Sequence, residues 1–446
     1  MPRDANTTPA PTPLDPLLIE TTGPIDATIR VPGSKSITNR ALAIAALADG
    51  NSELTGALVA EDRDVMVEGL RALGLQIDGA SSDTTLVVHG RRGTIPARNA
   101  NLDLRLSGTA IRFLAALVAL GDGTYHLDGT HRMRERPIGD LLDTLNALGV
   151  RATDELGTGC PPVRIETEGL PGGSAMIAGE RSSQFLSALL MAAPAAKGPL
   201  HLEVQGELAS KPFVDMTLRM MRAFGVDVER DGYASFDVTP MRYQARRYAI
   251  EADAMAAGYF WAAAAVTGGR VRTPGIGAKS LQGDRRFAEV LTAMGCDVTV
   301  SDGATTVVGP PAGRLRGGRF DLNDMPDQAQ TLAVCALFAD EPVRIDNVWN
   351  LRIKETDRLH ALASELRRLG AHVVEEESGI EINPLTPETL RTPVTIRTYG
   401  DHRMAMAFAV AGIRIPGVSL EDPACVAKTY PAFFEDWGRL YQHRVP

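Results

Sequence analysis

The sequence predicts an α/β protein built from six related units, and three observations carry this prediction. An amphipathic helix that ends at a glycine before an apolar strand returns five times along the chain. An alanine-rich helix followed by a small-residue turn and a strand interleaves with it six times. The chain has 446 residues, too many for one ordinary core, and six units of about 74 residues fit that length.

The first repeated pattern is a helix followed by a glycine at its C-terminal end. Glycine suits this position because it adopts the left-handed conformation at little cost. Residues 70–74 are one example, and an apolar strand start follows directly. The glycines, separated by 75, 76, 70 and 75 residues, are Gly74, Gly149, Gly225, Gly295 and Gly370.

The second repeated pattern is the alanine-rich helix. These helices are apolar on nearly every side, so we expect them to be buried, with the leucine–glycine helices outside them. The period exceeds the repeats of about 20–50 residues found in common solenoids, which favours compact units within domains. The last unit is cut short after Phe433. The six segments are 41–56, 115–127, 189–204, 262–271, 333–345 and 406–420.

Composition excludes several classes of protein. Hydrophobic residues make up 44% and charged residues 23%, as in soluble globular proteins, and the net charge of −9 argues against general nucleic-acid binding. No apolar run of about 18 residues is present, so no membrane span is expected. Residues 1–16 are rich in Pro and Thr and lack an apolar core, which predicts a disordered tail rather than a signal peptide.

The cysteines and histidines predict no metal site. The eight histidines include neither an HExxH motif nor a pair at ligand spacing. The cysteines are widely separated and form no CxxC motif, which fits a reduced cytoplasm. They are Cys160, Cys296, Cys335 and Cys425.

The first candidate anion site is a glycine turn. It lies between a predicted strand at 27–31 and a predicted helix at 41–50, which ends at Gly50. Lys35 and Ser36 lie at the helix start, where unpaired N–H groups and the positive end of the helix dipole favour an anion, and Arg40 lies one turn on. A capped helix with solvated charges explains the stretch equally well. The motif GxxxxGK[ST] is absent, so a nucleotide is not implied.

Further polar or cationic islands occur near the other alanine-rich helices. Each alone has an ordinary explanation as an N-cap, a dipole partner, a solvated loop or an exposed ion-pair ladder. In the densest island, Lys354 and Arg358 share a face at helical spacing. A carboxylate flanked by such cations can have its pKa adjusted for acid or base catalysis beside bound anions. Because the placement recurs in every unit, we predict that helix starts converge on a small, multiply anionic substrate. The islands are 106–112, 132–138, 181–186, 210–213, 324–327, 350–358, 400–406 and 428–431.

Taken together, these islands resemble the enolpyruvyl transferase family, and within it the 5-enolpyruvylshikimate-3-phosphate synthases (3-phosphoshikimate 1-carboxyvinyltransferases). The resemblance spans roughly residues 18–434, and each piece is weak alone whereas the combination is highly specific. The motifs, in family order, are PGSKSITNR, SGTAIR, RERPI, SSQFLSALLM, SKPFVD, PDQAQT, LRIKETDR, GDHRMAMAF and AKTYP.

The resemblance implies an α/β fold of two similar, hinged domains, each of three repeated α/β units in an inside-out, barrel-like arrangement. One domain would contain residues 17–32 and 253–446, and hence both chain ends, while the other would contain residues 33–252. The hinge would lie near 32–33 and 252–253, where the chain crosses between the domains.

The implied reaction transfers the carboxyvinyl group of phosphoenolpyruvate to the 5-hydroxyl of shikimate 3-phosphate and releases phosphate. The resemblance implies no metal, organic cofactor, nucleic acid or membrane, only these small-molecule substrates, in a cytoplasmic monomer. Asp327, Glu355 and Lys35 would be catalytic, with Asp327 as the base for the hydroxyl. Shikimate 3-phosphate would contact Ser36, Arg40, Ser182, Ser183, Gln184, Ser210, Asp327, Asn350 and Lys354. Phosphoenolpyruvate would contact Lys35, Gly108, Arg136, Gln184, Arg358, Arg403 and Lys428.

Three residues depart from the family pattern. Leu106 replaces the usual Asn before the Gly-Thr turn, Phe113 replaces the usual Pro, and Phe213 replaces an aromatic residue that carries a hydroxyl. The first two flank the turn against which phosphoenolpyruvate and the family's inhibitor glyphosate would pack. The departures therefore predict reduced sensitivity to glyphosate.

Three other functions compete with this one. The sister enzyme acts on UDP-N-acetylglucosamine and carries a Lys-Asn pair at the first motif and a loop cysteine, whereas this chain has Lys35-Ser36 and no cysteine before Cys160. A non-catalytic anion-binding protein of the same fold is the second alternative, and the joint presence of Lys35, Asp327, Glu355 and Arg403 speaks against it. A phosphosugar-binding regulator would need a further module for which the length leaves no room.

Overall fold

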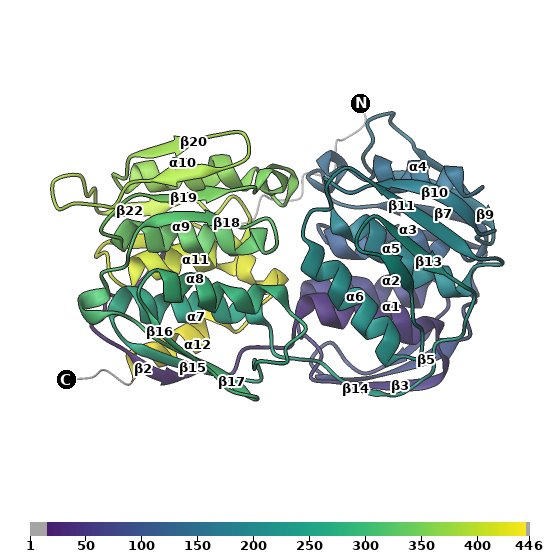
Figure 1. Ribbon diagram of the computed structural model, residues 1–446, viewed down its shortest axis with the longest axis horizontal. Helices are drawn as coiled ribbons and strands as arrows, with labels where there is room; N and C mark the ends of the chain where they lie inside the picture. Colours follow the sequence, from purple (N-terminus) through teal and green to yellow (C-terminus); the bar gives the residue numbers. More distant parts are fainter. Residues whose placement is uncertain (1–15, 443–446) are drawn as a thin grey trace, which may run out of the picture.

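The computed structural model describes residues 16–442. The predicted disordered tail at 1–16 lies outside the described residues except for Pro16. Figure 1 shows two halves side by side, one holding the purple-to-teal part of the chain and the other mainly the green-to-yellow part, each with helices packed among sheets.

Six sheets share one strand order. A parallel pair comes first, and in the complete sheets two antiparallel strands follow it. In the first half the sheets are β14 (Arg247–Ala249), β3 (Asp49–Thr55), β5 (Thr85–Arg91) and β4 (Gln76–Asp78); β6 (Asn99–Asp103), β7 (Asp122–Asp128), β9 (Val163–Glu168) and β8 (Arg151–Asp154); and β10 (Gly173–Ala178), β11 (Leu200–Gln205), β13 (Ser235–Val238) and β12 (Glu229–Asp231).

The second half repeats this order, with one sheet shortened to three strands. Its parallel strand β22 pairs with β23, and the antiparallel partner β1 comes from the start of the chain, so the sixth unit lacks a hairpin of its own. The sheets are β2 (Asp26–Thr28), β15 (Arg270–Pro274), β17 (Ala304–Val308) and β16 (Asp297–Val300); β18 (Gly318–Asp321), β19 (Val343–Asp346), β21 (Ile380–Ile382) and β20 (Val373–Glu375); and β22 (Val394–Ile396), β23 (Val418–Leu420) and β1 (Leu17–Leu18).

The six alanine-rich helices are almost wholly buried, as predicted. Their apolar surface faces neighbouring helices and the inner faces of the sheets, which is the arrangement that an all-round apolar helix requires. One boundary prediction is wrong: the first of these helices ends at Leu47, and Gly50 lies in β3, because the chain turns directly into that strand. The helices are α1 (Lys35–Leu47), α3 (Gly108–Val118), α5 (Ser183–Ala192), α7 (Ala254–Thr267), α9 (Ala329–Cys335) and α11 (His402–Gly412).

The leucine–glycine helices present one face to this interior and the other to solvent. Each is followed, two residues on, by the predicted glycine with a positive φ, between 83° and 103°, so the left-handed glycine ends are confirmed. These helices are α2 (Glu61–Ala72), α4 (Gly139–Ala147), α6 (Lys211–Ala223), α8 (Phe287–Ala293) and α10 (Arg358–Arg368), and α12 (Phe433–Gly438) closes the chain.

Two separate hydrophobic cores result. One gathers buried residues between Ile37 and Ile250, and the other gathers residues 19–31 together with residues from Ala254 to Leu440. Each core encloses three alanine-rich helices. The predicted fold class, two similar α/β domains of three units each, is therefore confirmed.

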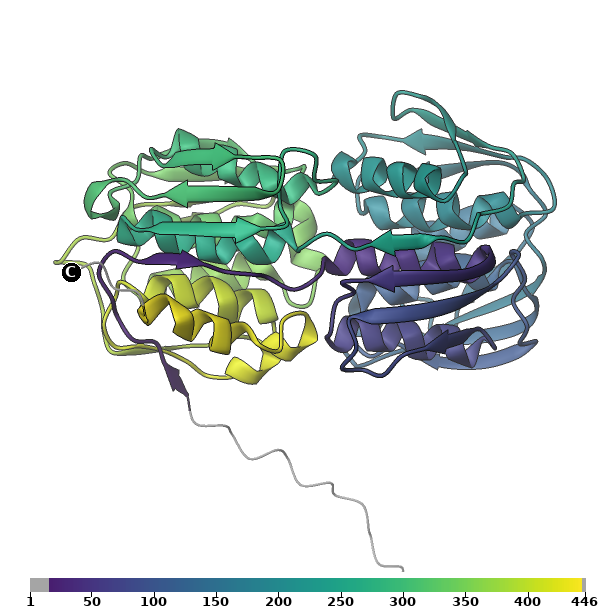
Figure 2. The same ribbon diagram turned by 90° about the horizontal axis from the view of Figure 1, so that it is seen from below.

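Two segments of the chain, the crossing strands near 32–34 and 251–253, connect the halves and run side by side, as Figure 2 shows. Ser34 N donates to Glu251 O at 2.8 Å, and Asp253 N donates to Pro32 O at 2.8 Å. Lys35 N, at the start of α1, donates to the Asp253 carboxylate at 3.0 Å. This carboxylate also caps α7, so one acidic side chain serves the first helix of both halves.

Other expectations concern what the chain lacks. Each helix in the described part of the chain is too short or too polar to cross a membrane. All four cysteines are free thiols.

Gly33, in one of these connecting strands, packs closely against the backbone at Gly56. A Cβ at this position would lie 1.9 Å from Gly56 O, so Gly33→Ala must displace backbone where the chain crosses between the halves. We expect the free energy of unfolding to fall by about 2 kcal/mol, the scale of an overpacked core. Gly23→Ala is the matched control because its Cβ would meet no atom within 4 Å. Equal thermal stability of the two variants would contradict this account.

Candidate active site

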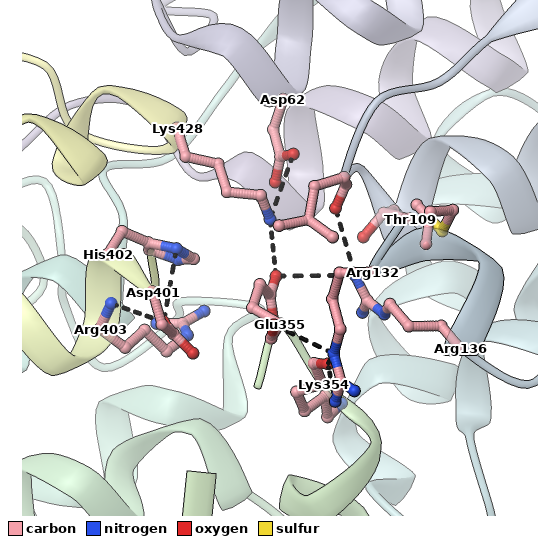
Figure 3. A network of polar contacts seen from close by, with 12 residues as sticks. Asp62, Thr109, Arg132, Arg136, Lys354, Glu355, Asp401, His402, Arg403 and Lys428 are labelled. Carbon is pink, nitrogen blue, oxygen red and sulfur yellow. Dashed lines mark hydrogen bonds and ion pairs between the residues drawn. The ribbon is translucent and has the colours of Figure 1, made fainter. Parts of the chain in front are cut away.

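The predicted residues come together where the two halves meet. The first half supplies groups from the starts of α1, α3 and α5 and from the loop after β7, and the second half supplies groups from α10, α11 and the turns before α9 and α10 and after β23. Figure 3 shows Glu355 at the centre of the resulting cluster, with Lys428 on one side and Arg136 on another.

Glu355 is buried and surrounded by cations. One carboxylate oxygen lies 2.6 Å from Lys428 Nζ and 3.8 Å from an Arg136 guanidinium nitrogen, and the other lies 2.8 Å from Arg358. Arg136 belongs to the first half and the other two cations to the second. The Glu355 carboxylate therefore sits at the junction of the halves.

Asp327, in the 3₁₀ turn η5 (Pro326–Gln328), forms the second carboxylate centre. Its oxygens accept hydrogen bonds from Arg358 at 2.9 Å and from Arg403 at 2.8 Å. Arg358 is almost fully buried and also donates to Asp401 at 2.7 Å. One guanidinium thus links Asp327, Glu355 and Asp401, which fixes the two predicted catalytic carboxylates relative to each other.

Asp62 joins the cluster from the first turn of α2. It is buried, 3.3 Å from Lys35 Nζ and 3.6 Å from Lys428 Nζ, so it bridges two predicted substrate-binding lysines from opposite halves. Nothing in the local sequence singles out this residue, because an acidic side chain in the first turn of a helix is ordinarily a dipole partner. Asp401 lies in the predicted island 400–406 without a predicted role, for the similar reason that it caps α11.

Both central carboxyl groups are ionised at neutral pH. Burial alone would raise the pKa of Glu355, but Lys428, Arg358 and Arg136 outweigh burial and hold it well below its usual range. Burial likewise opposes Arg403 and Arg358 at Asp327, whose pKa is also strongly lowered.

Lys354 has the opposite balance. Burial lowers its pKa to about 8, an effect that nearby Asp327 opposes and surrounding arginines reinforce. Its conformation corrects one prediction: the chain leaves the 3₁₀ turn η7 (Trp349–Ile353) at Lys354, with φ −92° and ψ −152°, and α10 begins only at Arg358. Lys354 and Arg358 therefore do not share a helix face, because residues 354–357 are not helical.

Gln184 and Gly108 form the first-half wall of the site. Ser182 caps α5 by accepting from Gln184 N at 3.2 Å, and both Ser182 and Ser183 are buried. Arg112, which ends the predicted island 106–112 but had no predicted role, donates to Gln184 Oε1 at 2.7 Å and so orients that side chain. A Cβ at Gly108 would meet the Arg136 guanidinium at 2.4 Å, so only glycine leaves room for this cation.

Arg40 lies apart from the carboxylate cluster. Its guanidinium donates to Thr217 at 2.7 Å, to Ser36 O at 3.0 Å and to Phe213 O at 3.2 Å, and it packs 5.2 Å from the Phe113 ring centroid and 5.9 Å from that of Phe213. Phe113 and Phe213, two of the three residues that depart from the family pattern, thus enclose this arginine. Burial lowers the pKa of Arg40 to about 9, and it remains a cation at neutral pH.

Leu106, the remaining departure, contributes through its backbone. Its carbonyl accepts from Arg136 at 3.1 Å, a contact that does not depend on the side chain. The predicted residue Ser210, at the start of α6, contacts the second half, where its amide donates to Asn323 Oδ1 at 3.2 Å. The buried Asn350 Oδ1 has no hydrogen-bond partner among residues 16–442.

The cavity beside Lys35 and Arg403 has a volume of about 20 Å³, enough for about one water molecule. A phosphate group is too large for this cavity. No group of three or more His, Cys, Asp or Glu side chains in the described part of the chain is arranged to hold a metal ion.

The protein has two repeated α/β domains, and buried cations from both converge between them. This arrangement is typical of proteins that bind a small anionic substrate between two domains. Residues 19–437 match the family model of EPSP synthase (3-phosphoshikimate 1-carboxyvinyltransferase). The chain belongs to this family.

Individual relatives agree with the family match. A 3-phosphoshikimate 1-carboxyvinyltransferase of Trichormus variabilis is 48% identical over 94% of this chain and 97% of its own, and one of Shewanella denitrificans is 45% identical over 94% and 97%. Among solved structures, an EPSP synthase from Acinetobacter baumannii superposes with a TM-score of 0.77 at 25% identity, covering 95% of this chain and 97% of its own.

Asp284, beside the site, predicts a pH dependence of stability. Burial, reinforced by Asp327 and Asp253, raises its pKa to about 7. The unfolded carboxyl titrates near about 4, so ionising it in the folded state is unfavourable, and this group's contribution to stability is lost as the pH rises from about 4 to 7. We expect Asp284→Asn to gain thermal stability relative to the wild type between pH 5 and pH 8. Asp302→Asn, at an exposed position, is the control. A difference between Asp284→Asn and wild type that stays constant with pH would contradict the burial argument.

Proposed function

We propose that the protein transfers the carboxyvinyl group of phosphoenolpyruvate to the 5-hydroxyl of shikimate 3-phosphate and releases phosphate. The observation that carries the proposal is the cluster of cations from both halves around Glu355 and Asp327, in a chain of the EPSP synthase family whose net charge is −9. Both substrates carry a phosphate and a carboxylate, so they need cations gathered at one place.

Asp327 is the proposed base. In the reaction, the 5-oxygen attacks C2 of phosphoenolpyruvate as its proton leaves and C3 gains a proton, which gives a tetrahedral intermediate. Elimination then removes a proton from C3 and expels phosphate. Asp327 is ionised between Arg358 and Arg403, as a base must be, and substrate anions that engage these arginines would make it more basic.

Glu355 and Lys35 are the proposed groups for proton transfer at C3 and at the leaving phosphate. Glu355 is ionised while Lys428 and Arg358 contact it, so it can donate a proton only after its pKa rises. A phosphate that takes over those two cations would raise its pKa by adding negative charge nearby. Which of Glu355 and Lys35 acts at each step is left open.

The proposed binding residues divide between the substrates by position. The buried hydroxyls of Ser182 and Ser183 lie at the N-terminal end of α5, a favourable place for a phosphate. Arg40 and the unpartnered Asn350 oxygen offer a cation and an acceptor for the carboxylate and hydroxyls of shikimate 3-phosphate. Ser36, Ser210 and Lys354 complete that set. Phosphoenolpyruvate is assigned to Lys35, Gly108, Arg136, Gln184, Arg358, Arg403 and Lys428.

The domain division belongs to the proposal as well. We assign residues 17–32 and 253–446 to one domain and 33–252 to the other, with a hinge near 32–33 and 252–253. The two antiparallel hydrogen bonds between the crossing strands support it, since rotation there would leave both cores intact. A single chain supplies both walls of the site, which supports a monomer, and the free thiols support a reducing compartment such as the cytoplasm.

Phosphate release from phosphoenolpyruvate tests the function. We expect release that requires shikimate 3-phosphate and does not occur with UDP-N-acetylglucosamine. Release only with the nucleotide sugar would favour the sister activity, and release with neither acceptor would favour a binding protein.

The two carboxylates can be tested separately. We expect Asp327→Ala and Glu355→Gln each to lower kcat by about 10²-fold or more, the scale of general acid–base catalysis. Asp324→Asn, three residues before Asp327 but half-buried and paired with Arg286, should retain nearly full turnover. Turnover close to wild type in Asp327→Ala and Glu355→Gln would remove both from the mechanism.

Glyphosate inhibition tests the departures from the family pattern. Phe113 is buried in α3 against Arg40, next to the turn that carries Gly108, and we expect it to alter how that turn meets an inhibitor. The inhibition constant measured against phosphoenolpyruvate should be weaker than for an enzyme with Asn and Pro at positions 106 and 113. Restoring those residues by Leu106→Asn and Phe113→Pro should tighten it. Inhibition as tight as in a typical sensitive enzyme would refute the expectation.

A further inference from the structure

We propose that Arg132 is a positioning residue, which holds the backbone of Lys354 and Glu355 from the opposite half once the halves have met. This inference rests on the proposed function. It adds to the site a residue whose hydrogen bonds to the second half go to backbone carbonyls rather than to side chains.

Arg132 reaches across the junction with its guanidinium group. Its Nε donates to the carbonyl oxygens of Lys354 and Glu355, both at 3.2 Å, and Nη2 donates to Lys354 O at 3.0 Å. The remaining nitrogen pairs with Glu135 at 2.5 Å, within the same turn, η1 (Met133–Glu135), and this contact orients the guanidinium toward the second half. Figure 3 shows Arg132 beside Lys354 and Glu355.

The segment that Arg132 holds has no regular structure of its own. Lys354 is extended, and residues 354–357 lie between η7 and the start of α10. Within residues 16–442, no other donor reaches the carbonyl oxygens of Lys354 and Glu355. Arg132 therefore supplies the hydrogen bonds that a helix or sheet would otherwise give to this stretch of backbone.

The same turn also touches the Glu355 side chain. Arg136, four residues after Arg132, lies 3.8 Å from the carboxylate, while Arg132 binds the backbone of the same residue. Because both arginines belong to the first half, these contacts form only when the halves meet. Closure and the placement of the proposed proton-transfer group are thereby coupled.

Arg134 provides a matched control. It lies between the two arginines in sequence, but it pairs with Asp128 of its own half at 3.0 and 2.6 Å and is half exposed. Its replacement removes the same charge from the same turn without removing a contact to Lys354 or Glu355.

The first measurement is kcat at saturating phosphoenolpyruvate and shikimate 3-phosphate for Arg132→Ala, Arg132→Lys and Arg134→Ala. We expect Arg132→Ala to lower kcat by about 10- to 100-fold, since displacing a catalytic group by about 1 Å can cost about 10²-fold. Arg132→Lys should recover part of the loss because an ammonium can still donate to one carbonyl. Arg134→Ala should stay within about twofold of wild type, and all three should melt within a few degrees of it.

A double-mutant cycle separates positioning from a structural role. In a Glu355→Gln background, Arg132→Ala should cost no more than about threefold, because the group that Arg132 places has already lost its function. The inference would be overturned if the effects of the two substitutions multiplied in the double mutant. It would also be overturned by a large drop in melting temperature for both Arg132 variants, or by turnover of Arg132→Ala equal to that of Arg134→Ala. Absence of shikimate 3-phosphate-dependent turnover in the wild type would instead defeat the proposed function.

Discussion

The structure depends on the burial of several cations at the junction of its two halves. A charge removed from water is tolerated only when it is paired and hydrogen-bonded. Here Glu355, Asp327 and Asp62 neutralise lysines and arginines whose burial would otherwise be unfavourable. The proposed substrates carry phosphate and carboxylate groups that can take over the same cations. In the proposed mechanism, the protein's own carboxylates pair with these cations and become available for proton transfer when substrate anions replace them.

The repeated unit explains how this junction is built. The N-terminal ends of buried helices from both halves, together with the loops beside them, supply the polar groups of the site, while the left-handed glycines turn the outer helices into the sheets. Neither half holds a complete site. Arg132, Arg136 and Ser210 of the first half reach the second, and Lys428 reaches back to Asp62. In the proposed mechanism substrate enters when the halves separate, and the two hydrogen-bonded crossing strands are the proposed hinge.

The sequence allowed the repeats, the buried helices and the glycine ends to be predicted, because each follows from local conformational preference and hydrophobic periodicity. The residues of the cluster were predicted as separate islands and then by resemblance. Their pairing was not predictable, since contacts such as that of Lys428 with Asp62 join elements distant in the chain. The helix face predicted to hold both Lys354 and Arg358 was wrong because residues 354–357 are not helical. The local pattern does not reveal the hydrogen bonds that Arg132 of the other half makes with this segment.

The most direct test of this account is a crystal structure of Asp327→Ala with shikimate 3-phosphate and phosphoenolpyruvate bound together. The account predicts phosphoenolpyruvate between Lys35 and Arg136 of one half and Arg358 and Lys428 of the other. It also predicts the phosphate of shikimate 3-phosphate at Ser182 and Ser183. Either substrate bound away from the junction, with the contacts of Glu355 to Lys428 and Arg358 unchanged, would contradict it.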